Sequence, residues 1–147
     1  MKKIAQSLFL FAAVLLLGTS NLSAQGNLEE ALQQAKESNK HVLINFSGSD
    51  WCRSCILLKK TILNTAEFKA FADKELVILD VDFPRLKKNR LSKEQTAKNE
   101  ALAEKYNKKG QFPTIILLDK EGKVVGKTGY KKLSPAQYIA HIESIIK

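Results

Sequence analysis

Short runs of apolar residues, each bounded by turn-forming residues, recur along the chain and predict β-strands. We expect four strands, at residues 41–47, 76–81, 114–118 and 123–128. The last two are separated by the segment Asp119-Lys-Glu-Gly122, whose Asp and Gly residues are typical of a turn. These two strands should therefore form an antiparallel hairpin.

Between the strands, apolar residues recur every three or four positions, which predicts amphipathic helices. Helices are expected over about 28–38, from Trp51 with a restart at 64–67, over about 92–107, and from 134 to the end. Three of them begin with a capping-box signal, in which Asn27, Ser92 and Ser134 are the N-caps. In the 92–107 helix, the residues expected to face inward are Ala97, Ala101, Leu102 and Tyr106.

The expected order of elements is α-β-α-β-α-β-β-α. Strands that are separated by helices favour parallel pairing, and the closing hairpin adds an antiparallel edge. We therefore expect one α/β domain over residues 25–147, with a mixed four-stranded sheet and helices on both of its faces. A single domain suits a chain of 147 residues.

The first 24 residues follow another pattern. Two lysines precede an unbroken apolar run at residues 8–17, and a polar stretch then ends in Ser23 and Ala24. This is the three-part pattern of a secretory signal peptide, and the run is shorter than the roughly 20 residues that span a membrane. We expect cleavage near Ala24 and a periplasmic or secreted mature protein, with an uncleaved N-terminal anchor as the alternative.

The chain is basic, with 24 Lys and Arg residues against 15 Asp and Glu residues and a formal net charge of +9. Four of the cations, Arg85, Lys87, Lys88 and Arg90, form a run that is usually a solvated loop. We expect no nucleic-acid partner for an exported protein. Acidic partners or an anionic membrane surface stay possible through charge attraction.

Cys52 and Cys55 are the only cysteines, and three uses are open to them: a structural disulfide, a metal site or a reactive pair. A disulfide that closes so short a loop removes little unfolded-state entropy. A closed zinc site needs about four ligands, and only His41 and His141 could join the cysteines, without a ligand spacing. A copper(I) carrier could use the two soft thiolates alone.

The position of the cysteines favours the reactive pair. They lie where a predicted strand ends and a helix begins, and the unpaired N–H groups of a helix N-terminus stabilise a thiolate. Cys52 is at this helix start, whereas Cys55 lies one turn further in, close enough to form an internal disulfide. Cys52 is therefore the predicted nucleophile and Cys55 the predicted resolving residue.

A Cys-x-x-Cys motif preceded by Trp51, within "VLINFSGSDWCRSC", resembles the thioredoxin superfamily. The segments "GQFPTIILLD" and "KEGKVVGKTGY" resemble that family's cis-proline loop and its hairpin. The whole mature chain fits, and it is similar to secreted bacterial thioredoxin-like proteins and to the C-terminal domain of the transmembrane thiol-disulfide interchange protein. The resemblance implies the thioredoxin fold, here with an extra N-terminal helix.

The resemblance also implies roles for individual residues. Pro113 matches the cis proline that faces the disulfide, Phe112 the residue whose backbone pairs with substrate, and Trp51 a wall of the groove. A proline facing the pair would block copper binding. The family further implies protein disulfides as substrates, a membrane thiol–disulfide electron carrier as the reductant, and no cofactor; we also expect a monomer and no metal.

Two features depart from the family pattern and should tune the cysteines. Asn45 occupies the place of a typical buried acid and cannot accept a proton from Cys55; Asp80 and Asp82 could do so only if the strand face allows. Between the cysteines lie Arg53 and Ser54. A cation beside Cys52 should lower its pKa below the free value of about 8.5 and make the protein less reducing.

Together these patterns predict a periplasmic thiol–disulfide oxidoreductase that reduces or isomerises protein disulfides through Cys52 and Cys55. Two alternatives of other classes remain open. One is a non-catalytic thioredoxin-fold module for binding or chaperoning, and the other is a copper or zinc carrier that uses the two cysteines as ligands.

Overall fold

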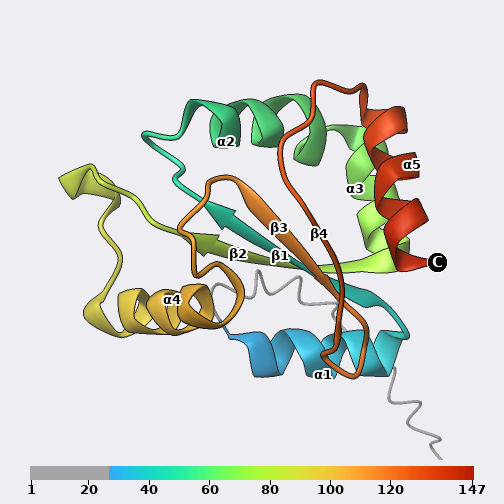
Figure 1. Ribbon diagram of the computed structural model, residues 1–147, viewed down its shortest axis with the longest axis horizontal. Helices are drawn as coiled ribbons and strands as arrows, with labels where there is room; N and C mark the ends of the chain where they lie inside the picture. The colour runs from blue at the N-terminus through green and yellow to red at the C-terminus, as the bar shows by residue number, and fades with distance from the viewer. Residues whose placement is uncertain (1–26) are drawn as a thin grey trace, which may run out of the picture.

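The sheet is assembled around β1 (His41–Ser47) in this computed structural model, which describes residues 27–147. β1 pairs in parallel with β2 (Leu76–Asp82) and antiparallel with β3 (Thr114–Leu118), and β3 pairs antiparallel with β4 (Val124–Thr128). The order β2-β1-β3-β4 confirms the predicted mixed four-stranded sheet and its closing hairpin (Figure 1). The parallel pairing expected of helix-separated strands holds for β1 with β2 but is wrong for β3, which runs antiparallel to β1. The expected signal peptide, residues 1–24, lies outside the described residues.

The helices have bounds close to those predicted: α1 (Leu28–Ser38), α2 (Arg53–Leu58), α3 (Ala66–Glu75), α4 (Lys93–Tyr106) and α5 (Pro135–Ile146). α2 continues into the π-helix η1 (Lys59–Leu63), and the 3₁₀ turn η2 (Lys87–Asn89) lies in the connection before α4. Across residues 27–147, no helix combines the length and the apolar character needed to cross a membrane.

Both faces of β1 are buried, which explains its nearly continuous apolar sequence. Leu43 belongs to one core cluster, whereas Val42, Ile44 and Phe46 belong to the other. Since side chains alternate along a strand, Asn45 faces the same side as Leu43. β1 therefore separates two cores and carries one amide on the first of its faces.

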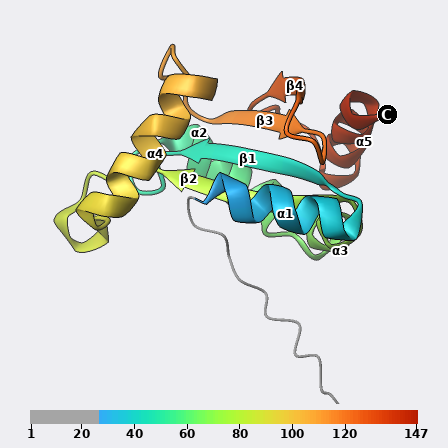
Figure 2. The ribbon, with the colours of Figure 1, turned by 90° about the horizontal axis from the view of Figure 1, so that it is seen from below.

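The two cores are covered by different helices. On the face of Leu43, the buried residues come from α2, η1, α3 and α5, and Phe68 and Tyr138 are the largest of them. On the other face, α1 and α4 cover the strands, and Ala31 and Ala35 allow α1 to approach closely. Figure 2 shows α1 in front of the sheet and α3 behind it. The predicted thioredoxin-type layering, including the extra N-terminal helix, is confirmed.

The inward face predicted for α4 is wrong in part. Ala97 and Ala101 are exposed, whereas Asn99 is buried at 2% exposure. The Asn99 Nδ2 donates to the Asp82 carbonyl oxygen at 2.8 Å, and its Oδ1 accepts from the Gln95 Nε2 at 2.8 Å. α4 packs where β2 ends, and the strand's last carbonyl needs a donor there, so an amide faces inward instead of an alanine.

A buried tyrosine joins α5 to the segment that follows β4. Tyr138 is fully buried, and its Oη donates to the Gly129 carbonyl oxygen at 2.9 Å. Burial raises the pKa of the Tyr138 hydroxyl well above its ordinary value of 10, so it stays a donor through the alkaline range. This bond holds the end of the hairpin against the helical layer.

We expect Tyr138→Phe to lower the free energy of unfolding by about 1 kcal/mol, because the Gly129 carbonyl loses its donor while the ring stays packed. Urea unfolding of the oxidised protein measures this change. Tyr106→Phe is the matched control, since the Tyr106 hydroxyl bonds to no described residue, and it should leave stability nearly unchanged. Equal effects of the two substitutions would contradict the assigned role of the bond.

Candidate active site

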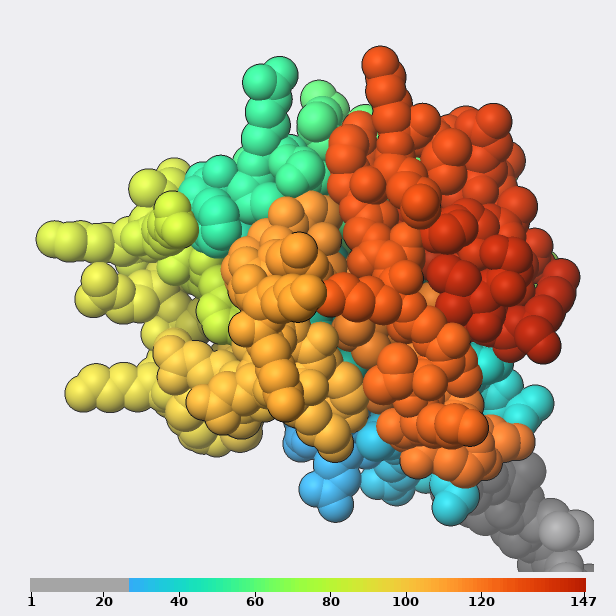
Figure 3. All heavy atoms as spheres, viewed as in Figure 1, coloured from blue at the N-terminus to red at the C-terminus, as the bar shows by residue number. Residues whose placement is uncertain are grey.

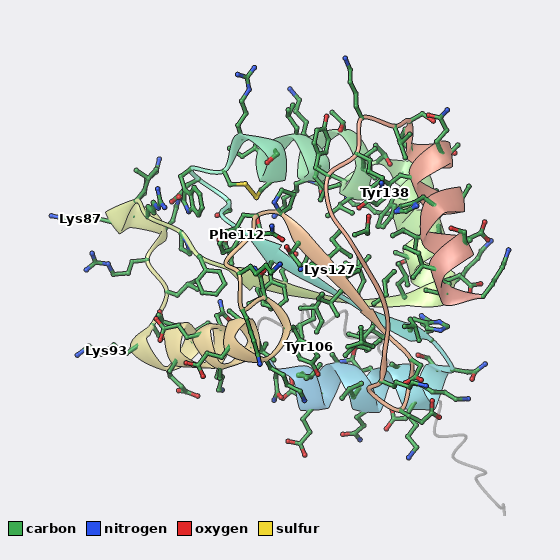
Figure 4. The ribbon with its side chains drawn as sticks, in the orientation of Figure 1. Lys87, Lys93, Tyr106, Phe112, Lys127 and Tyr138 are labelled. Carbon is green, nitrogen blue, oxygen red and sulfur yellow. A yellow bond between two sulfur atoms is a disulfide. The ribbon has the colours of Figure 1, made fainter. Side chains whose placement is uncertain are left out.

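Cys52 and Cys55 form a disulfide at the first turn of α2, drawn as a yellow bond in Figure 4. Cys52 is the N-cap of the helix, and the Cys55 backbone N–H donates to its Sγ at 3.3 Å. The Ser54 hydroxyl lies 3.6 Å from the same sulfur. Cys52 is 7% exposed and Cys55 3%. The helix start therefore directs hydrogen-bond donors at the more exposed sulfur.

The segment before the cysteines, residues 48–51, is tied to the segment that follows β2. The Phe83 backbone N–H donates to the Ser47 carbonyl oxygen at 2.8 Å and extends the pairing of β1 with β2. Ser49 then donates its backbone N–H to one carboxylate oxygen of Asp82 at 2.8 Å, and its hydroxyl to the other at 2.5 Å. Both carboxylate oxygens of Asp82 are thus hydrogen-bonded to Ser49.

Asp50 also connects the segment before the cysteines to the segment that follows β2. Its carboxylate accepts the backbone N–H groups of Arg85 at 2.9 Å and Leu86 at 3.0 Å, and the Asn89 Nδ2 at 3.0 Å. The hydrogen bond from Arg85 is the main cause that lowers the pKa of Asp50 below its ordinary value of 3.8. A lowered pKa means that this tie is complete above pH 3.8 and is lost as the pH falls through the lowered value.

Trp51 also connects these two segments, and it lies within an aromatic cluster. Its Nε1 donates to the Phe83 carbonyl oxygen at 2.7 Å, and the Arg85 guanidinium lies 3.8 Å from the centre of its ring. The rings of Trp51 and Phe83 each meet the Phe112 ring edge to face, with centroids 5.5 Å apart. A Cβ at position 48 would overlap the indole, so Gly48 leaves the space that the ring occupies.

The loop that carries Phe112 and Pro113 is held by side chains on either side of it. The Phe112–Pro113 peptide bond is cis. The buried Asn107 side chain bonds to both the N–H and the carbonyl oxygen of Gln111, at 3.2 and 2.9 Å. The Thr114 hydroxyl donates to that same carbonyl oxygen at 2.9 Å. A Cβ on Gly129 would lie 2.9 Å from the Pro113 carbonyl oxygen, so only glycine allows the two segments to approach this closely.

Asn45 pairs with Asp80 across the parallel strands. The two residues are register partners, and the Asn45 Nδ2 donates to the Asp80 Oδ1 at 2.8 Å. The Asn45 Oδ1 is buried and has no hydrogen-bond partner among the described residues. Asp80 therefore lies on the strand face that points toward α2, as its candidacy required, but its carboxylate is bonded to an amide.

Two hollows meet at Phe112. One, of about 780 Å³, is bounded by Trp51, Phe83 and the first turns of α4. The other, of about 620 Å³, is bounded by Ser54, Pro113 and Gly129. The sequence-predicted residues Trp51, Phe112 and Pro113 are therefore brought together around the start of α2, with an open surface on each side.

The two histidines do not extend the site. His41 opens β1, and His141 of α5 bonds to Thr128, with its Nε2 2.8 Å from the threonine hydroxyl. Desolvation and the charge of Lys131 lower the pKa of His141. Within residues 27–147, no three His, Cys, Asp or Glu side chains are grouped so that they could hold a metal ion.

Several residues at the site were not predicted to belong to it. Asp50 lies in the segment next to Cys52, and Phe83 and Arg85 contact that segment. No site role was predicted for Asp50 or Phe83, and Arg85 was interpreted as part of a solvated loop. No local signal links position 50 to position 85. The order of the elements could have indicated this contact, because two parallel strands end side by side at Ser47 and Asp82. The segments that follow them therefore start close together.

Comparisons with known proteins show which family this chain resembles. Residues 28–146 match the thioredoxin-like domain family. Disulfide bond reductase DsbH of Chlamydia pneumoniae is 38% identical over 118 residues, which are 80% of this chain and 69% of the relative. A solved DsbH oxidoreductase covers 88% of this chain and 92% of its own, with 35% identity and a TM-score of 0.73. The oxidised DsbD C-terminal domain of Neisseria meningitidis shares the fold, with a TM-score of 0.54 and 21% identity over 78% and 89% of the two chains.

We expect Asn45→Asp to destabilise the oxidised protein by about 2 kcal/mol at pH 7, because it places two carboxylates at hydrogen-bond distance in a buried site. Burial and the Asp80 charge raise the pKa of the introduced carboxyl above its unfolded value. The loss should therefore shrink toward pH 4, where that carboxyl is protonated, and grow as the pH rises.

Urea unfolding at several pH values between 4 and 8 measures this effect. The double variant Asn45→Asp/Asp80→Asn is the matched control, since it restores one amide and one carboxylate at the same two positions. It should recover most of the lost stability. A single variant whose stability runs parallel to wild type at every pH would refute the pairing.

Proposed function

Because the chain belongs to the thioredoxin-like domain family and is a thiol–disulfide oxidoreductase, we propose that it reduces or isomerises protein disulfides outside the cytoplasm. Cys52 is the nucleophile in this proposal and Cys55 the resolving residue. The observation that carries it is the Cys52–Cys55 disulfide at the start of α2, with the Cys55 N–H directed at the Cys52 sulfur. In the dithiol form the same N–H stabilises a Cys52 thiolate.

The first step starts from the dithiol form. The Cys52 thiolate attacks one sulfur of a substrate disulfide, and a mixed disulfide forms while the other substrate sulfur leaves as a thiolate and takes up a proton. Arg53 is exposed next to Cys52, and its positive charge favours the thiolate. The Ser54 hydroxyl, 3.6 Å from the Cys52 sulfur, adds a further donor.

The second step regenerates the internal disulfide. Cys55 gives up its proton and attacks the Cys52 sulfur, which releases the second substrate sulfur as a thiol. Two electrons have then passed from the cysteine pair to the substrate. Asn45 has no basic group, so we assign the proton of Cys55 to water or to the departing substrate thiolate.

The residues around Phe112 are the proposed binding surface for the substrate chain. Pro113 and Gly129 line the smaller hollow together with Ser54, one residue before Cys55. A peptide laid against the Phe112 backbone would present its disulfide to Cys52, and the Trp51 ring would form the opposite wall. Positioning of this kind supplies much of the rate of a bimolecular exchange.

The reductant and the location follow from the same proposal. The predicted signal peptide supports a periplasmic or secreted protein, and each turnover leaves an oxidised pair that must be reduced again. A membrane thiol–disulfide electron carrier is the proposed donor, and the shared fold with the DsbD C-terminal domain is consistent with it. We also propose that the protein acts as a monomer, because helices of the same chain cover both sheet faces.

We expect Cys55→Ser to accumulate a mixed disulfide with an oxidised substrate such as insulin, because the second step is blocked while the first is intact. Turnover should fall by at least about a hundredfold. Cys52→Ser is the matched control and should form no such adduct. Non-reducing gel electrophoresis after acid quenching detects it. A Cys52→Ala protein that kept full biological activity would instead favour a non-catalytic binding module.

The direction of the reaction is tested by the reduction potential of the Cys52–Cys55 pair, measured by equilibration with glutathione. A reductase should have a potential near the roughly −270 mV of thioredoxin, and an oxidant one near −120 mV. Since the similar DsbH protein is named a disulfide bond reductase, we expect the value to lie nearer the reducing end. Failure of the two thiols to form an internal disulfide in this titration would refute the proposed function.

A further inference from the structure

The larger hollow, beside Trp51, is not used by either chemical step. Its base is aromatic, formed by Trp51, Phe83 and Phe112, and its volume is about 780 Å³. The connection between β2 and α4 forms one wall, through Pro84 to Leu91, and the first turns of α4 form the other. A concave, largely apolar surface of this size can receive several side chains of a bound chain.

Two residues that line the hollow connect it to the site of the reacting cysteines. Trp51 is bonded directly to Cys52 along the backbone, and its ring borders the hollow. Phe112 borders both this hollow and the one around Pro113. A peptide held at Pro113 with its disulfide at Cys52 would therefore pass Phe112 and enter the larger hollow with its next residues.

The rim of the hollow is basic. Arg85, Arg90 and Lys93 line it, and Lys87 and Lys88 lie on the same exposed loop. None of these five cations forms a salt bridge with a described residue. Two acids also line the hollow: Asp82, which is bonded to Ser49, and the exposed Glu100. In Figure 3 long side chains project from this side of the molecule, and Figure 4 labels Lys87 and Lys93 among them.

The basic loop is held in place before any partner binds. Asp50 accepts three hydrogen bonds from Arg85, Leu86 and Asn89, and the Arg85 guanidinium rests on the Trp51 ring. The backbone of the basic loop is thus positioned by residues 50 and 51, which directly precede Cys52. A loop whose backbone is already positioned binds an anionic ligand at a lower entropic cost than a mobile loop would.

We propose that this hollow is a selection groove that binds an acidic and partly apolar peptide segment flanking the substrate disulfide. The proposal rests on the function proposed above and adds the substrate class. Unpaired cations around an aromatic base complement carboxylates next to apolar side chains. A concave site favours a peptide over an anionic lipid surface, which would need the cations on a flat or convex face.

The kinetic experiment compares three disulfide peptides of one length, whose flanking residues are acidic, neutral amide or basic. For the reduced protein we expect the acidic peptide to react about five- to tenfold faster than the neutral one, as a few rim charges allow. The ratio should shrink as salt is added. The Arg90→Gln/Lys93→Gln variant should bring the ratio of the acidic-peptide rate to the neutral-peptide rate close to one. The Arg90→Glu/Lys93→Glu variant should react faster with the basic peptide.

Lys69→Gln/Lys74→Gln is the matched control, because it removes the same charge from exposed positions of α3 on the other sheet face. It should leave the ratio unchanged. Equal ratios in the control and the groove variant would overturn the proposal, since the preference would then reflect net charge alone. The rate with the neutral peptide tests the proposed function separately from the groove.

A binding experiment needs no redox chemistry at all. Trp51 is the only tryptophan, and it borders the groove, so its fluorescence reports occupancy in the oxidised wild-type protein. A cysteine-free peptide of alternating glutamate and leucine should change this fluorescence saturably, whereas its glutamine counterpart should bind several-fold more weakly. Absence of binding by the acidic peptide would overturn the proposal even if disulfide reduction is observed.

Vesicles separate a peptide site from a membrane surface. Phosphatidylglycerol vesicles should not displace the acidic peptide from the wild-type protein. If these vesicles bind the protein and compete with the peptide, and the Arg90→Gln/Lys93→Gln substitutions abolish both effects, the basic loop is a membrane contact and the selection groove is refuted.

Discussion

The hydrogen bonds between residues 47–51 and residues 82–89 are the constraint on which the site depends. β1 and β2 are parallel and end side by side, so the chain must leave both strands at one edge of the sheet. Ser49 binds Asp82, the last residue of β2, and Asp50 and Trp51 bind Arg85 and Phe83 in the segment that follows. The redox pair, the indole and the basic loop are therefore held as one unit, although they come from distant parts of the chain.

Buried asparagine side chains fix the ends of elements and loops near the site. Asn99 closes the end of β2, and Asn107 holds the loop before Pro113 through two bonds to Gln111. Each supplies a partner for backbone groups that no strand or helix satisfies, and an unpaired buried group of that kind costs about 1–3 kcal/mol. Asn45 differs, since one of its two polar atoms stays without a partner beneath the active-site face.

The parts that could be predicted are those with a short-range cause. The N-caps Asn27, Ser92 and Ser134 act within three residues, and the helices begin where they indicated. The apolar runs of β1 and β3 marked strands that are buried on both faces. The inward face of α4 was predicted less well, because Asn99 is buried in order to bond to the last carbonyl group of β2. Ala97 and Ala101 fit an apolar helical stripe better than Asn99 does, yet they are exposed and Asn99 is buried.

By itself, the sequence determined the order of the elements, the closing hairpin and the position of Cys52 and Cys55 at a helix start. Local spacing, capping and alternation are sufficient causes for all of these. Only the tertiary structure decided that Asp50 binds a loop 35 residues away, that Asn45 meets Asp80, and that a basic rim surrounds an aromatic hollow. Such contacts depend on strand register and loop path, and these are set by the packing of the whole core.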